Sequence, residues 1–328
     1  MENHEERINE IVRKEFDADV LSIKRITEGY SHFMYDIEIN KFPFIIIIRF
    51  SNSINKRFNL AKEKYVIEIL QSNNIPSPKI YAFHYPQENE KEGYMILGKF
   101  KGQRLDTIWD FLSKEEKIKI TKELGKLLSE IHKIKLPKYG FVGEYGNIIT
   151  EMSEDLFEFR SQGEKTEHSQ FLKEFLAEIL KDLARVMAFK TVSPEFIKDF
   201  MHYLAKNLDK IDSCQEPTLI HGDFMTGHIF VDKIEGEYKI QGLIDFEFAL
   251  SLSPDYDFIK LHRQGFFEDE ELKNALKESY GEINEEAVKV HRIIRDLQFA
   301  IVLLESGNKE LHEEKISEIW EKIKSELS

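Results

Sequence analysis

The stretch that decides the fold runs over residues 219–249 and reads LIHGDFMTGHIFVDKIEGEYKIQGLIDFEFA. It holds two segments rich in β-branched and aromatic residues, separated by a turn signal at Glu235–Gly236. The segments on either side of such a turn pair as an antiparallel hairpin. The hairpin interrupts a part of the chain that otherwise reads as helical.

Polar side chains stand at the ends of these apolar segments. Asp223 follows His221 and Gly222, His228 lies five residues after Asp223, and Asp245 ends the second segment in the sequence GLID. A hairpin between the segments brings their far ends together. We therefore expect Asp223, His228 and Asp245 to meet in one small volume.

Phosphoryl transfer needs such a set of groups. One carboxylate orients the attacking hydroxyl and accepts its proton, and other ligands hold the metal ions that neutralise the nucleotide's phosphates. Protein kinases arrange these groups as H-R-D-x-x-x-x-N followed by D-F-G. Here the pattern is H-G-D-x-x-x-x-H followed by D-F-E.

The first hundred residues have the pattern of a small sheet carrying one helix. Three strand-like runs cover residues 20–26, 33–39 and 44–50. An amphipathic helix is predicted over residues 60–71 and ends before Pro76 and Pro78, which cannot continue it. Two more strands are expected at residues 81–84 and 94–100.

The pattern turns helical after Gly102. Leu124, Leu127, Leu128 and Ile131 form one apolar stripe, and further helices are predicted over residues 171–188, over 194–208, and from 257 to the end. The sequence therefore predicts an α+β protein, with a small sheet lobe before a larger, mainly helical one.

Composition indicates a soluble, cytoplasmic chain. The N-terminal sequence MENHEERINE lacks the apolar stretch of a signal peptide, and the longest apolar run, residues 42–48, is too short to cross a bilayer. The single cysteine, Cys214, cannot form an internal disulfide, which suits a reducing compartment. We interpret Cys214 as incidental.

The formal net charge of −14 bears on partners. Such a chain repels the phosphate backbone of nucleic acid, and the sequence shows no local basic patch that would offset this repulsion. The surplus of acidic residues is compatible with cationic ligands. The alternative is that it contributes to solubility only.

Two motifs carry a resemblance to a known family. HGDFMTGHIFVD and LIDFEFALSLSPDYDF resemble the catalytic and metal-binding motifs of the aminoglycoside phosphotransferase and choline kinase family. The histidine at position 228 makes the chain most similar to the aminoglycoside 2''-phosphotransferases. RFNLAKEKYVIEIL, NNIPSPKI, YMILGKFKG and LGKLLSEIHKI follow in the family's order, so the resemblance covers nearly the whole chain.

The resemblance implies a protein-kinase-like fold of two lobes. The N-terminal nucleotide-binding lobe would span residues 1–100, with a hinge at about residues 97–101. The C-terminal lobe, residues 102–328, would hold the catalytic loop, the metal site and a helical acceptor-binding subdomain.

The same resemblance assigns roles in catalysis. Asp223 would be the catalytic base, His228 and Asp245 would face Mg²⁺, and Asp257 would be a structural acid. Arg49 would contact phosphate, paired with a helix glutamate, Glu63.

Nucleotide binding would involve two further segments. Gly98 and Phe100 would offer backbone groups to the base of ATP or GTP at the hinge. The loop over residues 28–33, which contains Ser31, would cover the phosphates.

The chain departs from the family pattern at four positions. Arg49 stands where a lysine is usual, and it keeps the charge with a different geometry. Gly29 is the one glycine of the phosphate loop, and Glu247 replaces the glycine of D-F-G. His228 is a poor ligand for a hard cation such as Mg²⁺ and would act through a bound water.

Several residues have a structural alternative. Arg49 and Glu63 could be ordinary surface charges. His132 fits a packing or hydrogen-bonding role, and His221 is expected to brace the catalytic loop.

The acidic run FFEDEEL contains Glu268, Asp269 and Glu271. It is either a solvated helix face or a binding surface for a cationic acceptor.

The functional expectation is a small-molecule kinase that transfers the γ-phosphate of ATP or GTP to a hydroxyl, with an aminoglycoside as the leading acceptor. Choline, a sugar or a macrolide is the alternative acceptor, and a catalytically silent nucleotide-binding pseudokinase is the alternative class. The retention of both Asp223 and Asp245 argues against the pseudokinase.

Overall fold

The structure, a computed structural model, divides into two compact units whose segments alternate along the chain. The first unit comprises residues 1–127, 142–147 and 225–249, and the second comprises 128–141, 148–224 and 250–328. The predicted boundary at residues 97–101 stays a prediction, because the units are defined by contacts and not by a hinge. The structure describes residues 4–27, 32–51, 57–86, 90, 92–143, 148–149, 151–152, 159–160, 168–189, 191–211, 216–306 and 309–327.

The first unit is built on a five-stranded antiparallel sheet of order β1-β2-β3-β5-β4. Its strands and the helices beside it are α1 (His4–Phe16), β1 (Val20–Ile26), β2 (His32–Ile39), β3 (Ile46–Ser51), α2 (Arg57–Ser72), β4 (Ile80–His84) and β5 (Tyr94–Gly98). All five predicted strands and the predicted helix are confirmed, with small shifts at their ends.

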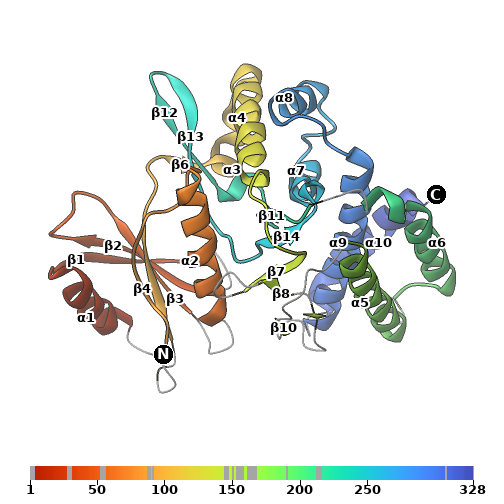
Figure 1. Cartoon of the computed structure of the whole chain (residues 1–328), viewed down its shortest axis with the longest axis horizontal. Helices are drawn as coiled ribbons and strands as arrows, with labels where there is room; N and C mark the ends of the chain where they lie inside the picture. The colour runs from red at the N-terminus through yellow and green to blue at the C-terminus, as the bar shows by residue number, and fades with distance from the viewer. Residues whose placement is uncertain are drawn as a thin grey trace. The chain divides into compact units, whose positions relative to one another are not determined.

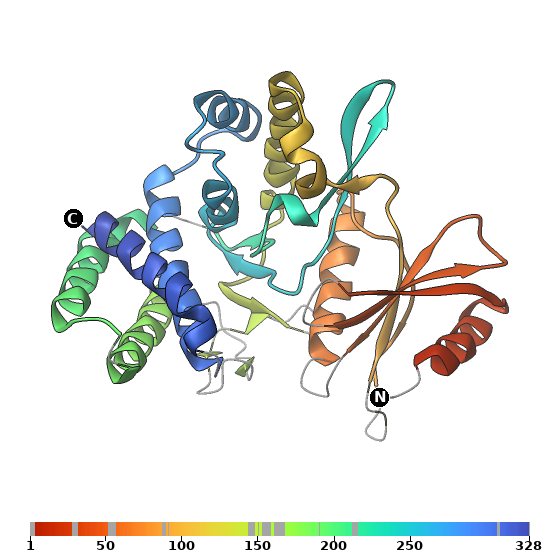
Figure 2. The same ribbon diagram turned by 180° about the vertical axis from the view of Figure 1, so that it is seen from behind.

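The two faces of this sheet have different neighbours. Side chains alternate along a strand, so Ile46, Ile48 and Phe50 of β3 lie on one face, in a core shared with the apolar side of α1. Ile47 and Arg49 lie on the other face. Both ribbon views show α1 and α2 on opposite sides of the sheet (Figures 1 and 2).

Helix α1 was not predicted from the sequence. Its residues are mostly charged, but Ile8, Ile11, Val12 and Phe16 follow the helical spacing and are buried. They pack against the sheet, which explains why so polar a segment forms a stable helix.

The hairpin predicted within residues 219–249 is confirmed and belongs to the first unit. β12 pairs with β13 around Glu235 and Gly236, whose φ angles of 52° and 88° are those of a left-handed two-residue turn. Leu243 N–H donates to the Pro76 carbonyl at 3.1 Å, which ties the hairpin to the chain after α2. The elements are β6 (Gln103–Arg104), α3 (Leu105–Ile108), η2 (Trp109–Phe111), α4 (Lys114–His132, which crosses into the second unit), η3 (Thr226–His228), β12 (Ile229–Ile234) and β13 (Glu237–Leu243).

The second unit is mainly helical, with one small sheet of order β11-β14-β7-β8. Within the described residues, a hydrophobic core of this unit forms where α5, α6, α9 and α10 pack together (Figure 2). Among the described residues, no helix has the length and apolar character needed to cross a membrane. The elements are β7 (Gly140–Val142), β8 (Ile148–Ile149), β9 (Glu151–Met152), β10 (Phe159–Arg160), α5 (His168–Phe189), α6 (Pro194–Ile211), β11 (Thr218–Ile220), β14 (Leu250–Leu252), η4 (Pro254–Asp257), α7 (Phe258–Arg263), α8 (Glu270–Tyr280), α9 (Glu285–Glu305) and α10 (Lys309–Leu327).

Candidate active site

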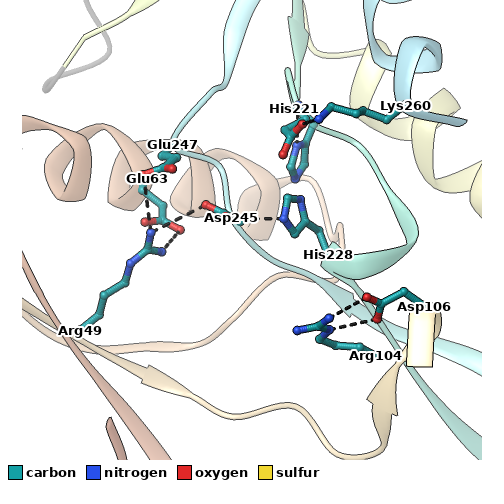
Figure 3. Close-up of polar contacts among 10 residues, drawn as sticks. Arg49, Glu63, Arg104, Asp106, His221, His228, Asp245, Glu247 and Lys260 are labelled. Atoms are coloured by element: carbon teal, nitrogen blue, oxygen red, sulfur yellow. Dashed lines mark hydrogen bonds and ion pairs between the residues drawn. The ribbon is translucent and has the colours of Figure 1, made fainter. Parts of the chain in front are cut away.

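A buried cluster of charges occupies the first unit, with Arg49 at its centre (Figure 3). Arg49 Nη1 donates to Glu63 Oε1 at 2.7 Å. Its Nη2 lies 3.7 Å from Asp245 Oδ1 and 3.9 Å from Glu247 Oε2. The contact of Arg49 with Glu63 was expected from the sequence, and the structure adds Asp245 and Glu247 to the pair.

The electrostatics of this cluster follow from its burial. Burial raises the pKa of Glu63 to about 7, against the lowering effect of the Arg49 guanidinium, and the charges of Asp245 and Glu247 raise it further. The three carboxylates hold the pKa of Arg49 above its usual value although burial opposes this. Three carboxylates around one guanidinium favour the binding of a further cation.

Lys62 is a member of the cluster that sequence reasoning missed. Its side chain is buried, and Nζ donates to the backbone carbonyl of Glu247. Burial lowers the pKa of Lys62 to about 8. Through this bond, α2 holds the chain immediately after Asp245, and the same helix supplies Glu63. Lys62 directly precedes the paired Glu63 in the run LAKEKY, which reads as a solvated helix face and gave no signal of burial.

The turn that carries Asp245 is held in an uncommon backbone conformation. Asp245 has φ 71°, in the left-handed region that non-glycine residues seldom adopt. Such a conformation persists where surrounding contacts fix it, and the contacts of Lys62 and Arg49 do so here.

His228 and Asp245, two of the three residues expected to meet, lie together. The third, Asp223, belongs to the second unit, and its meeting with them stays a prediction. The Ile244 N–H donates to the His228 carbonyl at 3.0 Å, and His228 Nε2 lies 3.5 Å from Asp245 Oδ2. Asp245 Oδ1 is buried with no hydrogen-bond donor. A carboxylate of this kind fits Mg²⁺, which binds few protein oxygens and keeps waters and phosphates as its other ligands. No cluster of three potential metal-binding residues occurs within the described ranges.

A cavity of about 140 Å³ opens beside this cluster, within the first unit. Its apolar walls suit a flat aromatic ring, and its charged members suit phosphates and a metal ion. The residues around it are Met34, Ile47, Arg49, Glu63, Pro78, Leu97, Gly98, Lys99, Phe100, Phe230, Ile244, Asp245 and Glu247.

The two predicted hinge residues lie in the wall of this cavity. The Gly98 N–H donates to the Lys79 carbonyl at 2.8 Å, so the group that Gly98 could offer to a nucleobase is its carbonyl. The Phe100 ring packs directly over Gly242, where any Cβ would overlap it. Ser31 and the other residues of the loop at positions 28–31 lie outside the described residues.

In the second unit, the loop that carries Asp223 is fixed through its backbone. The buried Asp257 carboxylate accepts hydrogen bonds from the N–H groups of His221 and Gly222, each at 2.7 Å. His132 Nε2 lies 3.1 Å from Asp257 Oδ2. Gly222 has φ 79°, a conformation that favours glycine. The predicted structural roles of Asp257 and His132 match these contacts.

Asp223 itself is held at both its backbone and its side chain. Its N–H donates to His221 Nδ1 at 3.2 Å, the bracing contact expected of His221. Lys260 Nζ forms an ion pair with Asp223 Oδ1 at 2.8 Å. Lys260 was missed in the sequence; its place three residues after Asp257 was the available signal.

The acidic run proposed for acceptor binding is partly engaged in local structure. Asp269 caps α8, where its side chain accepts from the N–H groups of Glu271 and Leu272. Glu268 Oε1 lies 3.5 Å from His262 Nδ1. Glu271 is exposed in the first turn of α8. A role for these three acids in binding an acceptor stays a prediction.

Comparisons with known proteins support the fold. The GDP complex of aminoglycoside 2'-phosphotransferase-IIIa matches with a TM-score of 0.69 at 15% identity, covering 99% of both chains. A macrolide 2'-phosphotransferase type I matches with a TM-score of 0.63 at 11% identity, covering 100% of this chain and 98% of that one. A putative fructosamine-3-kinase from Haemophilus somnus 129PT matches with a TM-score of 0.60 at 12% identity, covering 96% of each chain.

These likenesses confirm the predicted α+β, protein-kinase-like fold. A search of curated protein sequences finds no match. A model of the phosphotransferase enzyme family matches residues 22–291, which is most of the chain and includes both motifs that suggested the family. The chain belongs to the phosphotransferase enzyme family.

Proposed function

We propose that this enzyme transfers the γ-phosphate of ATP or GTP, with Mg²⁺, to a hydroxyl of a small molecule in the cytoplasm. The observation that carries the proposal is the buried Arg49 cluster beside an apolar cavity. That pairing of an apolar slot with fixed charges suits a nucleoside triphosphate, whose base is flat and whose phosphates are anionic.

The charged residues of the first unit would bind the phosphates. Arg49 would contact phosphate oxygens while Glu63 fixes its position. Asp245 would hold Mg²⁺, with His228 beside it acting through a bound water. The metal, when bound, would neutralise charge on the phosphates during transfer.

Asp223 would act as the general base in the second unit. Its loop is pinned by Asp257, and its carboxylate is partly exposed, so a hydroxyl can reach it. A fixed carboxylate orients the attacking hydroxyl and accepts its proton.

The leading acceptor is an amino-sugar of the aminoglycoside class. The support is the likeness to an aminoglycoside 2'-phosphotransferase, together with a net charge of −14 that favours cationic ligands. The likenesses to a macrolide phosphotransferase and a fructosamine kinase keep other sugars and small alcohols as the second candidate.

The test is a coupled assay of ADP or GDP release over a panel of amino-sugars, neutral sugars, choline and macrolides. The wild type should release nucleoside diphosphate with at least one acceptor, and Asp223→Asn should not. Nucleotide binding without turnover on any acceptor or on water would instead identify a pseudokinase.

A further inference from the structure

The ion pair between Lys260 and Asp223 has no place in the function proposed above. Lys260 Nζ lies 2.8 Å from Asp223 Oδ1, and the two side chains are 32% and 18% exposed. An ammonium at this distance forms a charge-assisted bond, stronger than a bond between neutral groups. The partial burial of both partners reduces the screening that weakens most surface ion pairs.

The position of Lys260 follows from the same element that fixes the loop backbone. α7 begins immediately after Asp257, so Lys260 stands about one turn beyond that buried carboxylate. Asp257 accepts from the N–H groups of His221 and Gly222, and Lys260 forms an ion pair with the side chain of Asp223. One short segment therefore fixes both the backbone of the loop and the orientation of the Asp223 carboxylate.

We propose that Lys260 is a positioning residue that also selects the acceptor by charge, an inference that rests on the proposed function. Its ammonium holds Oδ1 of Asp223, and Oδ2 receives the proton of the acceptor hydroxyl. The hydroxyl oxygen then forms its bond to the γ-phosphorus as the bond from that phosphorus to the β-phosphate oxygen breaks. Nucleoside diphosphate leaves with the electron pair of the broken bond.

The charge of Lys260 restricts which hydroxyl can react. An acceptor with an ammonium beside its reacting hydroxyl would bring a second cation to the carboxylate, and like charges at close range repel. An acceptor hydroxyl with a neutral neighbourhood meets no such repulsion. We therefore expect the reacting hydroxyl to lie away from any amine, even where the acceptor is an amino-sugar.

The experiment compares acceptors that differ in one charge. Glucosamine and N-acetylglucosamine form one such pair, and any amino-sugar active in the panel, with its N-acetylated form, makes another. Steady-state kinetics are measured for the wild type, Lys260→Gln, Lys260→Arg and a matched control, Lys289→Gln, at an exposed lysine of the same unit. Nucleotide hydrolysis without acceptor is measured in parallel, with water in place of the hydroxyl.

For the wild type, we expect the N-acetylated member to have the higher kcat/KM. In Lys260→Gln, the ratio of kcat/KM for the N-acetylated acceptor to kcat/KM for the free amino-sugar should fall by about 10-fold. This is the effect of removing one charge-assisted contact of about 1.4 kcal/mol. The kcat for the neutral acceptor and for hydrolysis should fall by a similar factor, with nucleotide KM unchanged. Lys260→Arg should recover most of both effects, and Lys289→Gln should match the wild type.

Two results would overturn the proposal in different ways. If Lys260→Gln keeps the wild-type preference and kcat while Asp223→Asn loses turnover, Lys260 has no positioning or selective role and the kinase function stands. A wild type that consumes no nucleotide under any condition removes the proposed function and this proposal together. The melting temperature of each variant identifies any loss caused by unfolding.

Discussion

The two sets of site residues are held in place by different means. In the first unit, Arg49, Glu63, Asp245 and Glu247 come from separate segments and fix one another through their side chains. In the second unit, one buried carboxylate, Asp257, fixes a loop through backbone N–H groups. The first set is thus a balance of buried charges, while the loop that carries Asp223 is held by a rigid backbone scaffold.

This difference predicts different responses to mutation. Removing one member of the charge cluster unbalances the others, because each buried charge depends on its neighbours for compensation. Removing the side chain of Asp223 leaves its scaffold intact, because the scaffold bonds to backbone. Substitutions within the charge cluster should therefore change binding and stability together, whereas loss of the Asp223 side chain should change turnover alone.

The largest expected effect is that of Asp223→Asn on turnover. An amide cannot accept the hydroxyl proton, so kcat should fall by about 1,000-fold, within the range for losing a general base. Nucleotide affinity and melting temperature should stay near the wild-type values, since the loop is held by Asp257. Stopped-flow kinetics and calorimetric titration with a non-hydrolysable nucleotide provide the two measurements. A variant with wild-type kcat would show that Asp223 is not the base.

Asp245→Ala should act on binding instead. It removes the carboxylate proposed to hold Mg²⁺, and we expect the Mg²⁺-dependent part of nucleotide affinity to fall by about 100-fold, since loss of even an outer partner of a metal ligand costs 10- to 100-fold. Titration with and without Mg²⁺ measures this part directly. An unchanged difference between the two titrations would place the metal elsewhere.

Asp257→Asn tests the backbone scaffold. An asparagine is neutral and keeps only one acceptor oxygen, so both N–H groups of His221 and Gly222 lose a charged partner and one of them loses its acceptor altogether. Hydrogen bonds to charged groups contribute about 1.5–3 kcal/mol each, so unfolding free energy should drop by about 2 kcal/mol. The kcat should fall with it, while nucleotide affinity stays constant. Urea denaturation of Asp255→Asn, a neighbouring acid, is the matched control.

The sequence predicted the elements better than the contacts between them. The strands, the helix over residues 60–71 and the hairpin followed from local patterns, and His228 met Asp245 because a hairpin fixes which residues face each other. Arg49 and Glu63 were paired through family resemblance, and their contact is present. No local pattern carries such a pairing, since it depends on how a strand and a helix pack.

The missed residues have a common physical reason. Lys62 donates to a carbonyl 185 positions away, and Lys260 pairs with a carboxylate in a different segment. Both lysines stand in sequences that read as solvated helix faces, and only tertiary packing buries Lys62 and brings Lys260 to Asp223. Asp269 differs from both lysines, because a helix cap is a local feature: Asp269 stands directly before the helix over Glu270–Tyr280, although the sequence was interpreted there as an acidic face or a binding surface.

Lys62→Met should change how stability depends on pH. Burial lowers the pKa of Lys62 to about 8 from 10.5, so between these values the unfolded chain binds more protons than the folded one. Wild-type stability then rises with pH across this window and is lost as pH falls through 8. Relative to the variant, the wild type should gain about 2 kcal/mol between pH 7 and pH 10. Urea denaturation of the wild type and Lys62→Met at pH 7 and pH 10 measures this gain. A difference in unfolding free energy between the two proteins that is the same at both pH values would contradict the buried ammonium.

The smallest expected effect is that of His228→Asn. His228 lies beside Asp245 at 3.5 Å, in a position where related kinases carry asparagine, and its imidazole is a poor ligand for Mg²⁺. An amide oxygen can take over a water-mediated or direct contact, so we expect kcat/KM to change by less than about 5-fold, or 1 kcal/mol. His228→Ala offers no ligand and should lower kcat/KM more than His228→Asn does. The difference in kcat/KM between the two variants should narrow as the Mg²⁺ concentration rises. Equal losses of kcat/KM in His228→Asn and His228→Ala would show that the imidazole acts on Asp245 rather than on the metal. The asparagine amide would in that case not substitute for the imidazole. The charge cluster would in that case extend to His228, and the contrast between a side-chain network in one unit and a backbone scaffold in the other would become sharper.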